Sequence, residues 1–204
     1  NWESPHVHPL DMTPDGSRLL AVNTADDRLE VFDASGPNLV LVGSIPVGLD
    51  PASVRARTND EAWVVNTVSD SISIVRLSTG SVVRTLKAED EPRDVVFAGS
   101  PERAWVSCSG TNVVLSFDPA NLSTPPTRIT IEGEAPRALA ASADGRKVFV
   151  AVFLSGNSTT VLGGGAITNI GFPPNVVGDP IGPYAGLNPP PNSSKRDGSS
   201  RLSR

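Results

Sequence analysis

The sequence predicts an all-β protein, and three observations support this prediction. The chain has 204 residues, of which 38% are hydrophobic, enough to build a core. It contains 18 glycines and 19 prolines, which interrupt long helices and favour short elements joined by turns. Four stretches of the chain superimpose in register, and each alternates apolar and polar residues as strands do. Helix bundles and coiled coils are therefore excluded.

The four repeat units begin at Pro5, Pro51, Pro92 and Pro136, and each contains the same series of strand signals. A short apolar stretch leads through a polar turn to a second strand with a large residue near its start. A third, alternating strand follows, and three of the units add a fourth strand candidate. Each unit therefore has the pattern and length of a four-stranded antiparallel β-propeller blade. The second strands are LLAVN at 19–23, AWVVN at 62–66, AWVSC at 104–108 and VFVAV at 148–152.

One large residue falls at the same place in the second strand of every unit. These residues are Leu20, Trp63, Trp105 and Phe149. A single meander cannot cover both of its faces, so the blades must stack around an axis. We therefore expect these four side chains to be wedges in the core between neighbouring blades.

The composition changes near residue 163, where a segment rich in Gly, Pro and Ser begins. It includes Pro189–Pro191 and the ending SSKRDGSSRLSR. Such a segment cannot bury enough apolar surface to offset its ordering entropy. We expect propeller blades over residues 1–165 and a linker or tail over 166–204. An arm laid over the body and a processing remnant are the alternatives for the tail.

The repeat resembles a known family. Its motifs here are TPDGSRLLAVN at 13–23, AWVVNTVSDSISIVRLSTGSVV at 62–83, AWVSCSGTNVVLSFDPANL at 104–122 and SADGRKVFVAV at 142–152. They resemble the YVTN-type repeat of lactonase-like, surface-layer and other secreted β-propellers. The resemblance implies a secreted, periplasmic or cell-surface location. It also implies a ring of typically seven blades, of which this chain holds about four.

The second unit departs from the pattern, and so does the number of units. Arg76 stands where the first and third units have Asp33 and Asp118, and Asn59-Asp60 replaces the Asp-Gly turn. Four blades are few for this family, so we expect an incomplete ring. Its remaining blades would lie beyond the tail, on another chain or outside this sequence. An open half-ring exposes an apolar blade face and strand edges, which predicts a partner or a homodimer.

Cationic side chains follow the prolines that start the units. They are His6, Arg93 and Arg137, and Arg55 lies close by in the second unit. If the first strand of each blade lines the central channel, these four side chains meet at one mouth and attract a carboxylate or phosphate ligand. Rim ion pairs with neighbouring carboxylates are the alternative for the two arginines at 93 and 137.

The two histidines occur as His6-Val-His8, and in an extended segment both point to the same side. With Asp11 nearby, they could bind copper, zinc or iron. This is the single metal-like pattern in the sequence, and otherwise no cofactor is predicted. The alternative is that this proline-flanked segment hydrogen-bonds to a blade edge.

The sequence predicts no catalytic residue. It has no G-x-S-x-G elbow and no phosphate-binding loop. Cys108, the one cysteine, lies within a predicted strand and is expected to be buried and inert. The net charge of −5 argues against nucleic-acid binding, and no apolar run is long enough to span a membrane.

Our first functional hypothesis is a non-enzymatic, extracytoplasmic binding or scaffold propeller. It would hold a protein or a small anionic ligand at the channel mouth or the loop face. The alternative is an enzyme or redox accessory, either with a metal at His6 and His8 or with lactonase-like hydrolysis in the complete ring. A third hypothesis is a purely structural half-ring that dimerises through its open blade.

Overall fold

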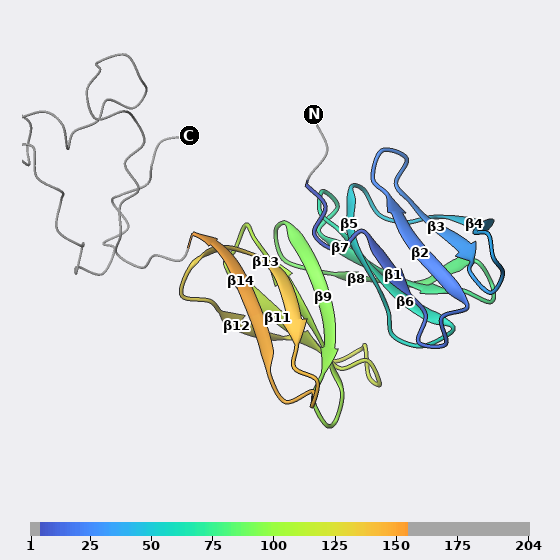
Figure 1. The fold of residues 1–204 in the computed structure, drawn as a ribbon. Helices are drawn as coiled ribbons and strands as arrows, with labels where there is room; N and C mark the ends of the chain where they lie inside the picture. The colour runs from blue at the N-terminus through green and yellow to red at the C-terminus, as the bar shows by residue number, and fades with distance from the viewer. Residues whose placement is uncertain (1–4, 155–204) are drawn as a thin grey trace, which may run out of the picture. The chain divides into compact units, whose positions relative to one another are not determined.

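The fold is described for residues 5–154 of the computed structural model, and it confirms the all-β prediction (Figure 1). This part of the chain consists of strands β1–β14 and contains no helix. It therefore has no helix that could cross a membrane. The predicted tail at 166–204 lies outside the described residues, as does the third strand expected in the fourth unit.

Each of the first three units forms one four-stranded antiparallel sheet whose strands pair in chain order. We call these sheets blades 1, 2 and 3. Blade 1 contains β1 (Leu10–Met12), β2 (Arg18–Asn23), β3 (Arg28–Asp33) and β4 (Val40–Pro46). Blade 2 contains β5 (Pro51–Ala56), β6 (Glu61–Asn66), β7 (Ser71–Arg76) and β8 (Ser81–Lys87). Blade 3 contains β9 (Pro92–Ala98), β10 (Arg103–Cys108), β11 (Val113–Phe117) and β12 (Thr127–Thr130).

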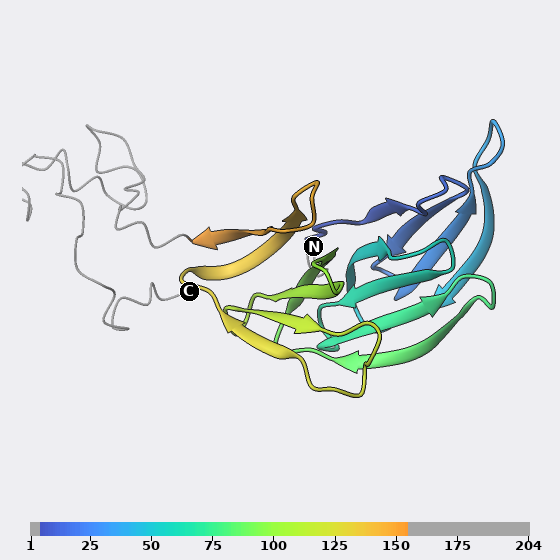
Figure 2. The ribbon, with the colours of Figure 1, turned by 90° about the horizontal axis from the view of Figure 1, so that it is seen from below.

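The fourth unit supplies two described strands, β13 (Glu134–Ala141) and β14 (Val148–Leu154), which pair with each other. We call this pair blade 4. The four sheets follow one another in a fan (Figure 2). The first strand of each blade is its inner strand, and each inner strand contacts the inner strand of the next blade, in the order β1, β5, β9, β13. This arrangement is that of part of a propeller.

Large apolar side chains fill the space between the blades, as the sequence predicts. Trp63 is fully buried, and its ring lies edge-on to Phe97 of blade 3, with 5.5 Å between ring centroids. Leu20 is equally buried in the cluster that joins blades 1 and 2. Trp105 packs in the cluster that includes Leu139 of blade 4. Three of the four predicted wedges are therefore confirmed.

The fourth predicted wedge, Phe149, is exposed. It lies on β14, and 58% of its surface is accessible. A wedge is buried only when a second sheet covers it, and within the described part of the chain blade 4 has a neighbour on one side only. The exposure of Phe149 therefore follows from its position in the last described blade.

A hydrogen bond that recurs three times joins each blade to the next. The hydroxyl of the residue directly after each second-strand motif donates to the carbonyl of the proline that starts the following unit. All three bonds are buried, so each hydroxyl gives a hydrogen-bond donor to a carbonyl that water cannot reach. The bonds are Thr24 Oγ1 to Pro51 O (2.7 Å), Thr67 Oγ1 to Pro92 O (3.0 Å) and Ser109 Oγ to Pro136 O (2.9 Å).

A second recurring contact fixes the loop that enters each new blade. An Asp or Asn with positive φ in the hairpin between the second and third strands accepts a bond from the backbone N–H of the residue that precedes the next unit-starting proline. Asp and Asn tolerate this left-handed conformation better than other side chains do. The bonds are Asp50 N to Asp27 Oδ1 (2.7 Å), Glu91 N to Asp70 Oδ1 (3.1 Å) and Ala135 N to Asn112 Oδ1 (2.8 Å).

The structure explains the departure of the second unit from the repeat. In blade 1, the carboxylate of Asp33 accepts bonds from the backbone N–H and hydroxyl of Ser35. In blade 2, Asp60 reaches across from the neighbouring turn and accepts the equivalent bonds from the N–H (2.6 Å) and hydroxyl (2.9 Å) of Ser78. Arg76 therefore replaces an aspartate at no cost to the turn, and its Nε lies 4.0 Å from Asp60.

Replacing Thr67 with valine tests the bond between blades. The substitution keeps the shape of the side chain but leaves the buried Pro92 carbonyl without its donor. We expect the free energy of unfolding to fall by about 1–2 kcal/mol, measured by urea denaturation. Thr85→Val on β8 is the control, because Thr85 is exposed, and its effect should stay within about 0.5 kcal/mol. Equal losses in the two variants would contradict the role of the bond.

Candidate anion site on the inner strands

The residues that follow the unit-starting prolines occupy equivalent positions, as the repeat predicts. Each one contacts, within its own blade, the side chain that follows the second-strand motif. The structure therefore holds these side chains against their blades rather than leaving them free at the mouth. The contacts are His6 Nε2 with Thr24 Oγ1, Arg93 Nε with Ser109 Oγ at 3.3 Å, and Arg137 Cζ above the ring of Phe153 at 4.6 Å from its centroid.

The two arginines of this set differ in how far their charge is neutralised. Arg93 is buried, and its Nη2 lies 2.9 Å from the carboxylate of Glu91. Arg137 is half-buried and has no carboxylate within ion-pair distance among the described residues. Its Nε is buried without a hydrogen-bond partner in the same part of the chain. The rim ion pair considered from the sequence thus describes Arg93, whereas Arg137 retains an unsatisfied donor.

Arg55 lies on β5, in the middle of the fan of inner strands. Its Nη2 is 3.6 Å from Asp94 Oδ2 on β9, and 22% of its side chain is exposed. Its Nε is buried and has no hydrogen-bond partner among the described residues. Asp94 therefore orients the guanidinium of Arg55 but does not use all of its N–H donors.

Asp94 is the functional candidate that the sequence did not reveal. Only 1% of its side chain is exposed, and it accepts bonds from the backbone N–H of Val95 (2.8 Å) and of Leu139 in blade 4 (2.9 Å). Burial raises the pKa of this carboxyl, against the opposing effects of the Leu139 N–H and Arg55. Asp94 thus links blades 2, 3 and 4. The one signal in the sequence was an acid, next to Arg93, in an inner strand that is otherwise apolar.

His8 and Asp11 come from the blade 1 segment that runs beside β5. The backbone N–H of His8 donates to Ser53 Oγ at 3.0 Å, and Asp11 Oδ2 accepts from the backbone N–H of Ala56 at 2.9 Å. Burial lowers the pKa of His8, and the Arg55 cation lowers it further, while Asp94 and Asp11 oppose this shift. The imidazole is therefore mostly neutral at neutral pH.

The structure does not bring the predicted metal ligands together. Within residues 5–154, no group of three or more His, Cys, Asp or Glu side chains is arranged to hold a metal ion. The ring of His6 contacts Thr24, His8 lies in the field of Arg55, and Asp11 is engaged by a backbone amide. In the described part of the chain, the three predicted ligands therefore do not form one metal-binding group.

Cys108 has the environment that the sequence predicts. It is fully buried at the end of β10, and burial raises the pKa of its thiol to about 12. The thiolate is the reactive form of cysteine, and almost none is present at neutral pH. Cys108 is therefore a core residue.

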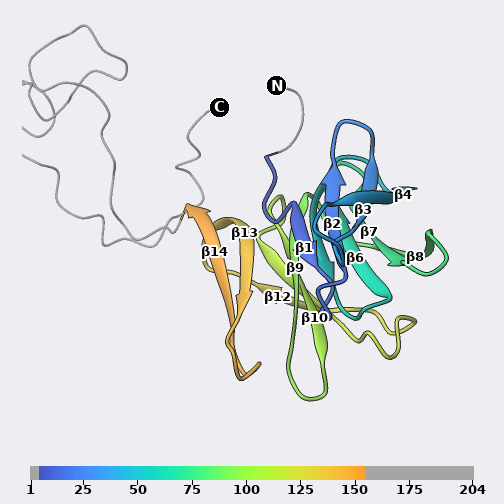
Figure 3. The same ribbon diagram turned by 45° about the vertical axis from the view of Figure 1, so that its right-hand side comes forward.

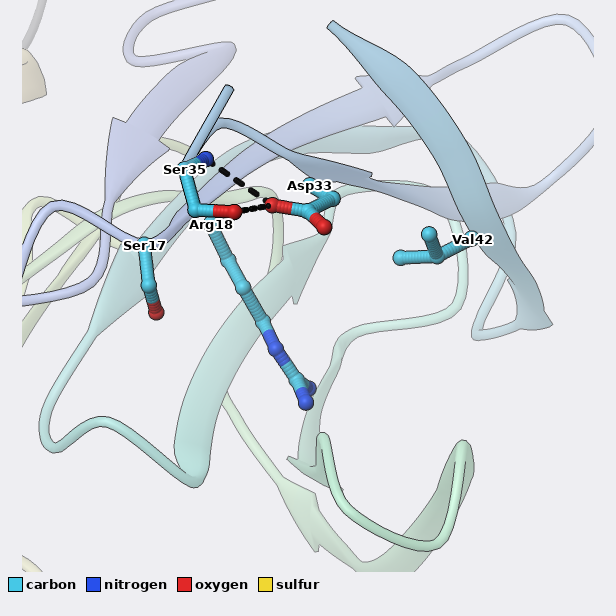
Figure 4. A pocket seen from close by; sticks show the side chains of 5 residues that line it. All are labelled: Ser17, Arg18, Asp33, Ser35 and Val42. Carbon is cyan, nitrogen blue, oxygen red and sulfur yellow. Dashed lines mark hydrogen bonds between the residues drawn. The ribbon is translucent and has the colours of Figure 1, made fainter.

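A hollow of about 340 Å³ lies on blade 1, apart from the inner-strand cluster (Figure 4). Ser17, Arg18, Asp33, Ser35 and Val42 line it. It opens at the end of β2 opposite to the end that carries Asn23, and it is formed by turns and by the outer strand β4. The carboxylate of Asp33 is bonded to Ser35, and these bonds lower its pKa. The hollow contains no acid–base group of shifted pKa other than this turn aspartate.

Comparison with known proteins identifies relatives of this fold. A family model described as "Lactonase, 7-bladed beta-propeller" matches residues 1–163. No curated protein matches. Among solved structures, hydrazine synthase of Kuenenia stuttgartiensis is 23% identical, with a TM-score of 0.66 over 76% of this chain and 45% of that one.

Two bacterial structures among the matches are described as lactonases. A proposed 6-phosphogluconolactonase of Bacteroides uniformis is 16% identical, with a TM-score of 0.60 over 73% of this chain and 48% of that one. Its counterpart from Bacteroides fragilis is also 16% identical, with a TM-score of 0.57 over 69% of this chain and 49% of that one. The chain thus spans about half the length of these structures. At such identities the likeness establishes the fold alone.

The burial of Cys108 predicts that its thiol does not react in the folded protein. We expect no labelling by iodoacetamide at about pH 8, because burial holds the thiol protonated. The same reagent should label the protein fully once urea unfolds it. Mass spectrometry measures both states, and rapid labelling of the folded protein would contradict the buried position.

The lowered pKa of His8 predicts a specific pH dependence of stability. Between the folded pKa and the ordinary value of 6.5, the unfolded chain binds more protons than the folded chain. The free energy of unfolding should therefore fall as the pH drops through this range. His8→Gln removes this contribution, while Arg55, Asp94 and Asp11, the charged groups facing His8, remain.

The measurement is urea denaturation of wild type and His8→Gln at about pH 7.5 and about pH 5.5. Wild type should lose more stability on acidification than the variant does. The raised pKa of Asp94 acts with the opposite sign, but it is present in both proteins and largely cancels in the comparison. Identical pH profiles would show that His8 titrates normally.

Proposed function

The chain belongs to the lactonase family of seven-bladed β-propellers, and from this premise we propose that its inner strands bind and hydrolyse a small anionic lactone. The class we favour is a sugar lactone that carries a phosphate or carboxylate. The observation that supports it is the pair Arg55 and Arg137, two inner-strand arginines whose buried Nε atoms have no hydrogen-bond partner within residues 5–154. The proposed 6-phosphogluconolactonases among the structural neighbours suggest the same class.

The contacts of Arg55 leave room for an anionic ligand. A strong arginine–carboxylate pair brings nitrogen and oxygen to about 2.7–2.9 Å, often through two parallel bonds. Arg55 and Asp94 are 3.6 Å apart and share one contact. Asp94 therefore orients the guanidinium without using all of its donors. A phosphate or carboxylate would satisfy the rest.

Arg137 supports the proposal in a different way. Its guanidinium carbon lies over the ring of Phe153, 4.6 Å from the ring centroid, which is a cation–π contact. The N–H donors lie in the plane of the guanidinium, so stacking does not consume them. Arg137 can therefore bind an anion edge-on while Phe153 fixes its orientation.

His8 supplies the acid–base group for hydrolysis. As a neutral imidazole it can take a proton from water as that water attacks the lactone carbonyl. The ring ester C–O bond then breaks, and the leaving oxygen takes the proton back, giving the open hydroxy acid. Arg55 beside His8 would stabilise the negative oxygen of the tetrahedral intermediate. The other blades of a seven-bladed ring would complete this site.

Binding without catalysis is the second candidate. The observation that favours it is that the carboxylates of Asp11 and Asp94 both accept backbone amides from the next blade. Because these two carboxylates hold neighbouring blades together, His8 is the one acid–base group of the cluster whose side chain is not engaged by a backbone amide. A YVTN-type, surface-layer-like protein outside the cytoplasm would fit such binding. The YVTN type and the location outside the cytoplasm both rest on the repeat resemblance.

Arg55→Gln tests the anion site. We expect it to weaken binding of 6-phosphogluconate, the product of the favoured class, by about 10-fold or more, because a charge-assisted bond is lost. Isothermal titration calorimetry measures the change. Arg84→Gln is the matched control, because Arg84 lies exposed on β8 and donates only to the carbonyl of Leu122.

Wild type and its variants also distinguish the two candidate functions. Hydrolysis of 6-phosphogluconolactone above the spontaneous rate, reduced in His8→Gln, supports the enzyme. Binding that depends on Arg55 without turnover supports the non-enzymatic candidate. If wild type binds neither lactone nor product, or if Arg84→Gln weakens binding as much as Arg55→Gln, the site is wrong.

A further inference from the structure

The ring of His6 is hydrogen-bonded to the junction between blades 1 and 2. Its Nε2 contacts the hydroxyl of Thr24, and the same hydroxyl lies 2.7 Å from the carbonyl oxygen of Pro51. A hydroxyl has one hydrogen to donate, and a carbonyl oxygen has none. The hydrogen of Thr24 is therefore donated to Pro51, and the hydrogen in the other contact must come from His6. The structure thus places a hydrogen on Nε2 of the imidazole.

The junction between blades 3 and 4 supports this assignment independently. Arg93 occupies the repeat position of His6, and its Nε lies 3.3 Å from the hydroxyl of Ser109. That hydroxyl donates to the carbonyl oxygen of Pro136 at 2.9 Å. A guanidinium can only donate, so the direction of both bonds in this junction is fixed. The same order, from a side-chain N–H to a hydroxyl to a carbonyl, accounts for both junctions.

The second nitrogen of the His6 ring is left with a lone pair. A neutral imidazole carries one N–H, so a hydrogen on Nε2 makes Nδ1 an acceptor. No hydrogen bond to Nδ1 occurs among residues 5–154, and His6 is exposed. A hydrogen bond at one ring nitrogen fixes the tautomer and the orientation of the ring, as it does in histidines that act as bases or ligands. His6 therefore presents an oriented hydrogen-bond acceptor.

This acceptor lies close in the chain to the inner-strand cluster. His6 and His8 flank Val7, whose backbone N–H donates to Ala52 O on β5 at 3.1 Å. Figure 3 shows this segment, at the blue end of the ribbon, leading into β1 beside β2. The chain bends at Val7, so the two rings reach different partners. Because Cα atoms two residues apart are separated by at most about 7 Å, one small ligand can reach both rings.

We propose that Nδ1 of His6 accepts a hydrogen bond from a hydroxyl group of the ligand and that Thr24 positions this ring. The inference rests on the proposed binding of a sugar lactone, or of its open acid, at the inner strands. Such ligands carry several hydroxyl groups, each of which is a donor. Arg55 and Arg137 can recognise only the anionic group of the ligand. His6 would therefore select hydroxylated anions over anions of the same charge without a hydroxyl.

Nuclear magnetic resonance of the imidazole nitrogens tests the tautomer. The chain contains two histidines, so the spectrum of His6→Phe assigns both. At about pH 8 the hydrogen of His6 should be on Nε2, and Thr24→Val should shift the ring toward the mixture of forms found in free histidine. Thr67→Val is the matched control, because Ala52 stands at the repeat position of His6 in blade 2. A hydrogen mainly on Nδ1, or a ring unchanged by Thr24→Val, would overturn the proposal.

Calorimetry with two probes tests the role of the ring. Wild type should bind 6-phosphogluconate about 5-fold more tightly than 6-phosphohexanoate, which has the same anionic groups and no hydroxyl. His6→Phe should lose this preference, Thr24→Val should weaken it, and Arg84→Gln should keep it. Circular dichroism confirms that each variant keeps its strands.

The outcomes separate this inference from the proposed function. If wild type binds both probes equally, or if His6→Phe keeps the preference, His6 does not recognise a hydroxyl, although the anion site at Arg55 stands. If wild type binds neither probe, the proposed function is wrong, and the role of His6 is wrong with it.

Discussion

The hydroxyl-to-carbonyl bond between consecutive blades is the constraint on which the rest of this structure depends. Thr24, Thr67 and Ser109 each donate to the carbonyl that opens the next inner strand. A buried carbonyl must be paired, so the next blade has one low-energy position. The aromatic and aliphatic wedges then fill a gap whose width is already set. Because the bond recurs at each junction, a single local rule is enough to build the fan of blades.

The same constraint explains why the candidate site forms from residues far apart in the sequence. Once inner strands lie side by side, the carboxylates of Asp11 and Asp94 each meet a backbone amide 45 residues further along. Arg55 enters the cluster from the blade between them. Burial raises the pKa of Asp94 and lowers that of His8, while the Asp94 carboxyl remains the ion-pair partner of Arg55.

The structure compensates locally where the repeat is imperfect. Arg76 replaces an aspartate in blade 2, and Asp60 from the adjacent turn makes the missing bonds to Ser78.

The sequence by itself determined the blades, because strand periodicity and turn residues are local properties that four copies reinforce. It also determined three of the four wedges and the burial of Cys108, which follow from repeat position. The tertiary structure alone decided which residues meet in the candidate site. Arg93 and Arg137 look alike in the sequence, but Glu91 neutralises one, whereas the other stacks on Phe153. Asp94 joins the site only through contacts with other blades, and no spacing along the chain encodes such contacts.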